Sequence, residues 1–181
     1  NAEALWHKHG SSKEGFAKQM NHHGKLGSQF PTAELRVVYS KAGIQPAACL
    51  IRSNAIIDHK LYWSKFTSEE EARYLESIFN SETARSRIAG YPYRSPWSAQ
   101  AFAPVMFNLP IPRFDERNKL HRDLADVAEK AEAVAAKVTL PDKVKFQQAR
   151  KLVRDDLHES TIAQTIDTLV AQLLDSAPKK S

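Results

Sequence analysis

The residues of this chain that could carry out acid–base chemistry are concentrated at Asp58, His59 and Lys60. An aspartate beside a histidine can supply a general acid or base, provided that a reacting group lies within hydrogen-bond reach. No nucleophile and no second carboxylate can be assigned to this pair from spacing. We therefore expect these residues to form a polar turn or to contact a phosphate backbone. A free-standing small enzyme that uses Asp58 and His59 is an alternative.

Histidine also occurs in two close pairs, His7 with His9 and His22 with His23. Imidazole nitrogen is a common metal ligand, but a metal site also needs cysteines or carboxylates at ligand spacing, and none stands beside these pairs. We predict no metal site. We interpret these histidines as part of a solvated loop, or as groups that face phosphate.

The sequence lacks the motifs of nucleotide-dependent and nucleophilic enzymes. It contains no glycine-rich dinucleotide turn, no Walker loop and no Gly-x-Ser-x-Gly elbow. Paired carboxylates occur only on expected helix faces among lysines and arginines, a pattern typical of a solvated surface. We predict no catalytic residue and no cofactor-binding residue in this chain.

A segment rich in aromatic residues, residues 89–98, combines Tyr91, Tyr93, Arg94 and Trp97 with two prolines and a glycine. Aromatic rings stack on bases, and arginine reaches base edges. Proline lowers the entropy that a loop loses on ordering. We interpret the segment as a nucleic-acid recognition loop. The alternative is that its rings only cover the core from outside.

The excess positive charge lies in the first part of the chain. Residues 1–113 contain 14 Lys and Arg against 9 Asp and Glu, whereas residues 114–181 contain 12 of each. This distribution predicts an anionic partner for the first part and a packing role for the second. The predicted DNA contacts, to phosphate or to bases, are Lys41, Arg52, His59, Lys60, Arg85, Arg87, Tyr91, Tyr93, Arg94 and Trp97.

A central helix is predicted from Ser68 to Ile88. Ser68 and Glu71 have the spacing of a capping box, in which each side chain satisfies a free backbone N–H group of the first turn. Apolar residues then recur every three to four positions, from Ala72 to Phe79, and form one stripe. The acidic residues lie at the start of this helix and the arginines near its end, as the helix dipole favours.

The other expected elements surround this helix. Alternating apolar residues and turn signals predict a hairpin within 34–52, and strands at 55–57 and 61–66 that extend the sheet. Residues 105–112 are expected to be a short strand or extended segment, and helices are expected over 116–138, 146–157 and 162–173, the first of them capped by Asp115 or Asn118. The predicted class is α+β: a small mixed β-sheet packed on a central helix, followed by a helical C-terminal part. We expect residues 1–113 and 114–181 to pack as one compact unit.

Composition places the chain among ordinary globular proteins. Of its 181 residues, 42% are hydrophobic and 26% are charged. No apolar run approaches the ~20 residues that a membrane-spanning helix needs. The single cysteine, Cys49, lies in an apolar run, so we expect it to be buried, and the lack of a disulfide framework predicts a cytoplasmic protein.

Three segments resemble one known family. They are 56–63 (IIDHKLYW), 72–84 (ARYLESIFNSETA) and 107–114 (FNLPIPRF). In these segments the chain resembles the C-terminal end of bacterial adenine-specific, S-adenosylmethionine-dependent DNA methyltransferases of restriction-modification systems. The part matched is similar to the Taq-type target-recognition domain and to the recognition domains of type I specificity subunits. The resemblance extends over roughly residues 35–174.

This resemblance implies a division of labour. An upstream catalytic domain, which would hold S-adenosylmethionine, flips out and methylates an adenine, while the C-terminal domain grips double-stranded DNA and reads its sequence. The family's catalytic tetrapeptide, Asn-Pro-Pro-Tyr or Asp-Pro-Pro-Tyr, is absent here. We therefore expect the chain to be a fragment of a longer methyltransferase, with its own catalytic domain and DNA as partners. The alternative is a protein-interaction scaffold that docks onto a catalytic or partner subunit without touching DNA.

Overall fold

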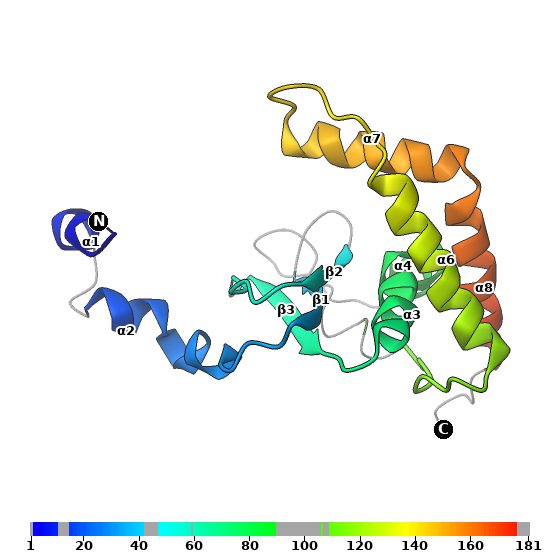
Figure 1. Cartoon of the computed structure of the whole chain (residues 1–181), viewed down its shortest axis with the longest axis horizontal. Helices are drawn as coiled ribbons and strands as arrows, with labels where there is room; N and C mark the ends of the chain where they lie inside the picture. The colour runs from blue at the N-terminus through cyan, green and yellow to red at the C-terminus, as the bar shows by residue number, and fades with distance from the viewer. Residues whose placement is uncertain are drawn as a thin grey trace.

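The computed structural model describes residues 2–10, 15–41, 47–58, 60–89, 106 and 109–176 (Figure 1). In chain order the elements are α1 (Ala2–His9), α2 (Phe16–Met20), η1 (His22–Gly24), η2 (Gly27–Gln29), β1 (Leu35–Ser40), β2 (Ala48–Arg52), β3 (Leu61–Lys65), α3 (Glu69–Asn80), α4 (Glu82–Ala89), α6 (Lys119–Ala135), α7 (Phe146–Glu159) and α8 (Ile162–Ser176).

The three strands form one antiparallel sheet in the order β2-β1-β3. Tyr39 of β1 pairs with Ala48 of β2 on one side and with Tyr62 of β3 on the other. The predicted hairpin and the third strand are therefore confirmed, as is the α+β class. The sheet is not mixed, because each pair of these strands runs antiparallel.

The predicted strand at 55–57 is wrong, and a side chain explains why. Gln29 accepts a hydrogen bond from the backbone N–H of Ile57 at 2.8 Å and donates one to its carbonyl at 2.9 Å. A single glutamine thus satisfies the groups that a neighbouring strand would otherwise pair. Arg36, which is fully buried, donates hydrogen bonds to the carbonyl of Ala55 in this segment and to the carbonyl of Ser53 just before it.

The predicted central helix is two helices, because the chain breaks at Ser81. The N-terminal cap is confirmed, since the Ser68 hydroxyl accepts a hydrogen bond from the N–H of Glu71. Ser81 adopts an extended conformation, and its hydroxyl accepts a hydrogen bond from the N–H of Ala84 in α4. The preceding residue, Asn80, bonds both backbone groups of Ala48 at 3.0 Å. The edge of β2 therefore holds the end of α3 in place.

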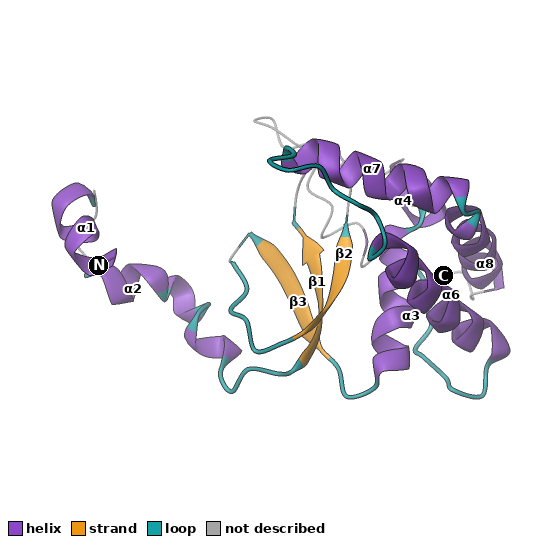
Figure 2. Cartoon of the chain, turned by 45° about the horizontal axis from the view of Figure 1, so that its top comes forward, coloured by secondary structure: helices purple, strands orange, loops and turns teal. Residues whose placement is uncertain are grey.

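Helix α3 is the centre of the packing (Figure 2). It contacts β1 and β2 on one side and α6 on another, and α8 packs against α6 and α4. The largest fully buried apolar side chains of this core come from α3, α6 and α8 and from Met106: Ile78, Met106, Leu124, Val170 and Leu173. The helices predicted for the C-terminal part are confirmed as α6, α7 and α8, and α6 and α8 share one core with the sheet.

The N-terminal helices extend away from this core (Figure 1). Trp6 of α1 and Phe16 of α2 contact each other, with ring centroids 6.1 Å apart. Apolar side chains along this extension are largely exposed, including Leu5, Met20 and Phe30. The extension therefore contributes little to the core.

Two sequence-based expectations concern exposure. Cys49 was expected to be buried but is exposed, because it lies on the edge strand β2. Among the described residues, no helix combines the length and the apolar character that a membrane crossing requires.

Thr161, between α7 and α8, is a site where a substitution should stabilise the fold. It has φ of 63°, a left-handed conformation that is costly for a β-branched residue. Its N–H donates to the carbonyl of His158, and its own carbonyl accepts from the N–H of Thr165, so these hydrogen bonds use only backbone atoms of Thr161. Replacing Thr161 by glycine should raise the free energy of unfolding by about 1 kcal/mol, measured by urea denaturation. An equal or lower stability would contradict the strain argument.

Candidate nucleic-acid interface

Two of the three segments that carry the family resemblance, 72–84 and 107–114, meet in the core of the structure. The Tyr74 hydroxyl of α3 donates a hydrogen bond to the carbonyl of Pro112 at 3.0 Å. The Tyr74 ring contacts Phe114 and His121, with centroids 5.6 and 4.8 Å away. His121 is buried and accepts a hydrogen bond from the N–H of Asp115, and burial lowers the pKa of its imidazole. These residues therefore build the scaffold, and contacts to a partner must come from the surface around it.

Arg52, one of the predicted DNA contacts, joins three elements of the fold. Its guanidinium lies 2.6 Å from Glu69 of α3 and 2.9 Å from Glu132 of α6. Arg73 also contacts Glu69, at 3.1 Å, and Glu129 of α6 at the same distance. In this structure, the charge of Arg52 is balanced by carboxylates that hold β2, α3 and α6 together.

Arg85 and Arg87 lie on α4, where both contact carboxylates. Arg85 forms an ion pair with Glu82, one turn earlier in the helix. Arg87 contacts Asp175 of α8 at 2.5 Å. Burial lowers the pKa of Arg85; the carboxylate of Asp167 on α8 opposes this shift, and the positive charge of Arg154 on α7 adds to it. Helix α4 therefore joins α8 through one of these arginines, while the other lies close to a cation of α7.

Lys41 and Lys60 lie together at the other end of the sheet from Arg52. Register explains this separation: Arg52 pairs with Leu35 at the start of β1, whereas Ser40 at the end of β1 pairs with Leu61. The N–H of Lys41 bonds the carbonyl of Lys60. Both lysines thus extend from adjacent strands at one end of the sheet.

A pocket of about 170 Å³ opens at this end of the sheet, and we call it the sheet-end pocket. The ammonium group of Lys41 lies 4.4 Å from the centre of the Tyr62 ring. Lys25, from the N-terminal segment, is a second lysine that lines the same pocket. Its lining residues are Lys25, Ser28, Gln29, Lys41, Ile57, Asp58, Leu61, Tyr62 and Trp63. Cations beside exposed rings are suited to phosphate and base contacts.

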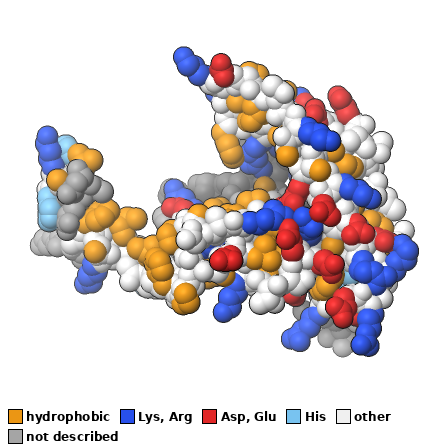
Figure 3. All heavy atoms as spheres, in the orientation of Figure 1, with side chains coloured by type: hydrophobic (Ala, Val, Ile, Leu, Met, Phe, Trp, Pro, Cys, Tyr) orange, Lys and Arg blue, Asp and Glu red, His pale blue; other side chains and the backbone are white. Residues whose placement is uncertain are grey.

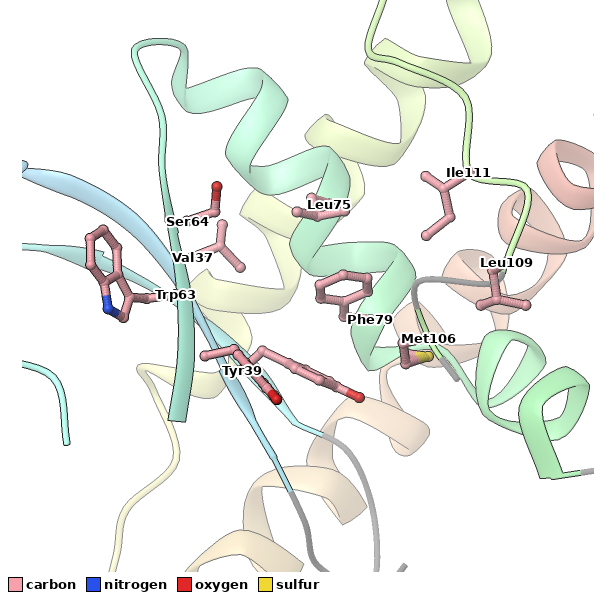
Figure 4. A pocket seen from close by; sticks show the side chains of 10 residues that line it. Val37, Tyr39, Trp63, Ser64, Leu75, Phe79, Met106, Leu109 and Ile111 are labelled. Carbon is pink, nitrogen blue, oxygen red and sulfur yellow. The ribbon is translucent and has the colours of Figure 1, made fainter. Parts of the chain in front are cut away.

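A second, larger pocket lies between the sheet and α3 (Figure 4). Its volume is about 390 Å³, and Val37, Tyr39, Tyr62, Trp63, Ser64, Leu75, Phe79, Met106, Leu109 and Ile111 line it. Burial raises the pKa of the Tyr39 hydroxyl, so that group stays protonated at neutral pH. The lining residues include no carboxylate, histidine or lysine. The pocket can accommodate apolar groups, but these residues provide no acid–base pair.

The remaining predicted contacts, His59, Tyr91, Tyr93, Arg94 and Trp97, lie outside the described residues. Of the five that are described, the structure brings together Lys41 and Lys60, while Arg52, Arg85 and Arg87 lie elsewhere and are ion-paired. Sequence reasoning did not select Lys25 or Gln29. The surplus of positive charge in residues 1–113 indicated an anionic partner for that part of the chain, which includes Lys25, but it did not single Lys25 out. No pattern predicted the contact of Gln29 with Ile57.

The described residues contain no group of three or more His, Cys, Asp and Glu side chains placed to hold a metal ion. The chain matches no family model, and comparisons with curated proteins and with solved structures give no match either.

Proposed function

We propose that this chain is the DNA-binding, target-recognition part of a bacterial adenine-specific, S-adenosylmethionine-dependent DNA methyltransferase of a restriction-modification system. The proposal combines the resemblance of three segments with the basic charge of residues 1–113. S-adenosylmethionine would bind in a separate catalytic domain of the parent enzyme, which would act on DNA in the bacterial cytoplasm.

The observation that carries the proposal is the sheet-end pocket. Two lysines that are remote in sequence, Lys25 and Lys41, line one depression together with the rings of Tyr62 and Trp63. Lysine ammonium groups neutralise phosphates, and aromatic faces stack on bases or pack against sugars. Phosphate contacts of this kind would set the register of the domain on DNA without reading sequence.

The resemblance and the pocket support the proposal in different ways. Tyr74, Phe114 and His121, which lie in or next to the resembling segments, pack against one another inside the molecule. Recognition surfaces are usually loops and element ends carried by such a rigid scaffold. In this proposal, the core holds the end of the sheet in place, and the end of the sheet contacts DNA.

Salt-dependent binding to a fluorescently labelled duplex of mixed sequence tests the proposal. Binding of the unaltered chain should weaken between about 50 and about 200 mM salt. A plot of the logarithm of the association constant against the logarithm of the salt concentration should have a slope of about −0.9 per phosphate contacted. Replacing Lys25, Lys41 and Lys60 by glutamine should reduce the magnitude of that slope by about 2 to 3 and the affinity by at least about tenfold.

The matched control removes three positive charges from α6 and the turn before it. Arg117, Lys119 and Lys130 are all exposed, so their replacement by glutamine changes net charge by the same amount. We expect this variant to retain most of the affinity. Absence of duplex binding by the unaltered chain would refute the proposal and favour the protein-interaction scaffold. An equal loss in both variants would show that general charge, rather than the sheet-end pocket, determines binding.

A further inference from the structure

Helix α7 stands apart from the rest of the helical part. It is 14 residues long and contains no buried residue, although α6 and α8 each contain several. In Figures 1 and 2 it projects from α6 and α8, and its N-terminal half reaches out over the side of the molecule where the strands lie. The space-filling view shows apolar side chains along the projecting part of α7 (Figure 3). Packing among the residues that the structure describes therefore does not account for the exposed half of α7.

The same region is strongly basic, although the C-terminal part as a whole is balanced. Residues 137–154 contain six lysines and arginines and a single aspartate, Asp142. Lys151 is paired with Asp155, but the first turn of α7 contains no acidic residue. Arg154 also lies near enough to Arg85 of α4 to affect it electrostatically. Such a concentration of like charge destabilises an isolated protein surface and attracts polyanions.

An exposed aromatic ring lies within this basic segment. Phe146, the first residue of α7, is 73% exposed, and the guanidinium of Arg150 lies 5.5 Å from the centre of its ring. The next two residues, Gln147 and Gln148, are also exposed. Glutamine side chains can form two hydrogen bonds with the edge of adenine, and apolar rings can pack against sugars or wedge between bases. The chemistry of this surface therefore complements DNA more closely than it complements an apolar protein surface.

We propose that residues 137–154 form a second DNA-contacting element, separate from the sheet-end pocket. In it, Lys143, Lys145 and Arg150 contact phosphates, and Phe146 packs against the duplex. The inference rests on the proposed function and extends it, because it assigns part of the DNA surface to the helical portion. Double-stranded DNA would lie along the exposed N-terminal half of α7.

Two variants of the full chain test this element by different readouts in the duplex assay. Replacing Lys143, Lys145 and Arg150 by glutamine should reduce the magnitude of the salt slope by about 2 to 3, because fewer counterions are released. Replacing Phe146 by alanine should lower affinity severalfold and leave the slope unchanged, because an apolar contact releases no phosphate counterion. Since Phe146 is 73% exposed, its loss should not unfold the protein, which circular dichroism checks.

The Arg117, Lys119 and Lys130 variant again serves as the control for net charge. If the unaltered chain binds duplex DNA and the α7 charge variant binds with the same affinity and slope, the inference is wrong while the proposed function stands. If the unaltered chain does not bind, both are wrong. A loss confined to the α7 variants, with the control unchanged, supports the second element.

Discussion

Replacing Glu76 by glutamine is expected to raise the free energy of unfolding by about 3 kcal/mol at about pH 8, and to have little effect at about pH 4. Glu76 lies on α3 and is 8% exposed. One carboxylate oxygen accepts a hydrogen bond from the N–H of Leu50 on β2 at 3.1 Å, and the other has no hydrogen-bond partner. Glutamine keeps the acceptor for Leu50 and removes the buried charge.

The pH dependence follows from the direction of the shift. Burial, with a smaller contribution from the charge of Glu132, raises the pKa of the Glu76 carboxyl to about 7. The unfolded chain ionises this group at about its usual pKa of 4.3. Since the folded pKa is the higher one, folding is not penalised below pH 4.3, and the penalty grows as pH rises to and through 7. The variant should therefore lose this part of the pH dependence.

Urea denaturation at several pH values measures the effect. Glu159→Gln is the matched control, since it removes one exposed carboxylate at the end of α7. His121 acts in the opposite direction: burial lowers the pKa of its imidazole, so its contribution to stability is lost as pH falls through the unfolded pKa of about 6.5. Comparing the variant with the unaltered chain at each pH removes the His121 contribution. If Glu76→Gln raised the free energy of unfolding by the same amount at about pH 4 and at about pH 8, the buried-charge explanation would be contradicted.

Replacing Ile78 by alanine is expected to lower the free energy of unfolding by about 3 to 4 kcal/mol. Ile78 is completely buried on α3, in the cluster that joins the sheet to α4, α6 and α8. Removing its branched side chain loses apolar burial and leaves a cavity that its neighbours cannot easily fill. Because the same helix supports the strands, this variant should also weaken DNA binding wherever it is partly unfolded.

The control for this prediction is the same substitution at an exposed position. Ile56 is 46% exposed in the segment before β3, and Ile56→Ala should cost less than about 1 kcal/mol. Urea denaturation of both variants measures these costs: the shift in the urea midpoint is converted to free energy with the same urea dependence for both variants. Similar costs at the two positions would mean that Ile78 does not belong to the stabilising core.

The sequence by itself determined the elements whose signals are local. Ser68 caps α3 as expected, and Asn118 caps α6 in the same way, because a capping side chain bonds an N–H group two or three residues away. Helical periodicity likewise predicted α6, α7 and α8, alternation predicted β1, and apolar runs bounded by turn residues predicted β2 and β3. These patterns depend on neighbours within a turn or along a strand, so they can be recognised from the spacing of residue types in the sequence.

Only the tertiary structure decided which polar groups meet across the chain. Arg87 finds Asp175, 88 residues away, and Gln29 bonds Ile57, 28 residues away. Asn80 and Ser81 end α3 early because β2 bonds the side chain of Asn80 from 32 residues away. Spacing along the sequence does not encode such partners, because packing alone brings them within hydrogen-bond distance. For the same reason, the sequence identified a basic front half, but the fold determined that Lys25 and Lys41 share a pocket while Arg52 is ion-paired at the other end of the sheet.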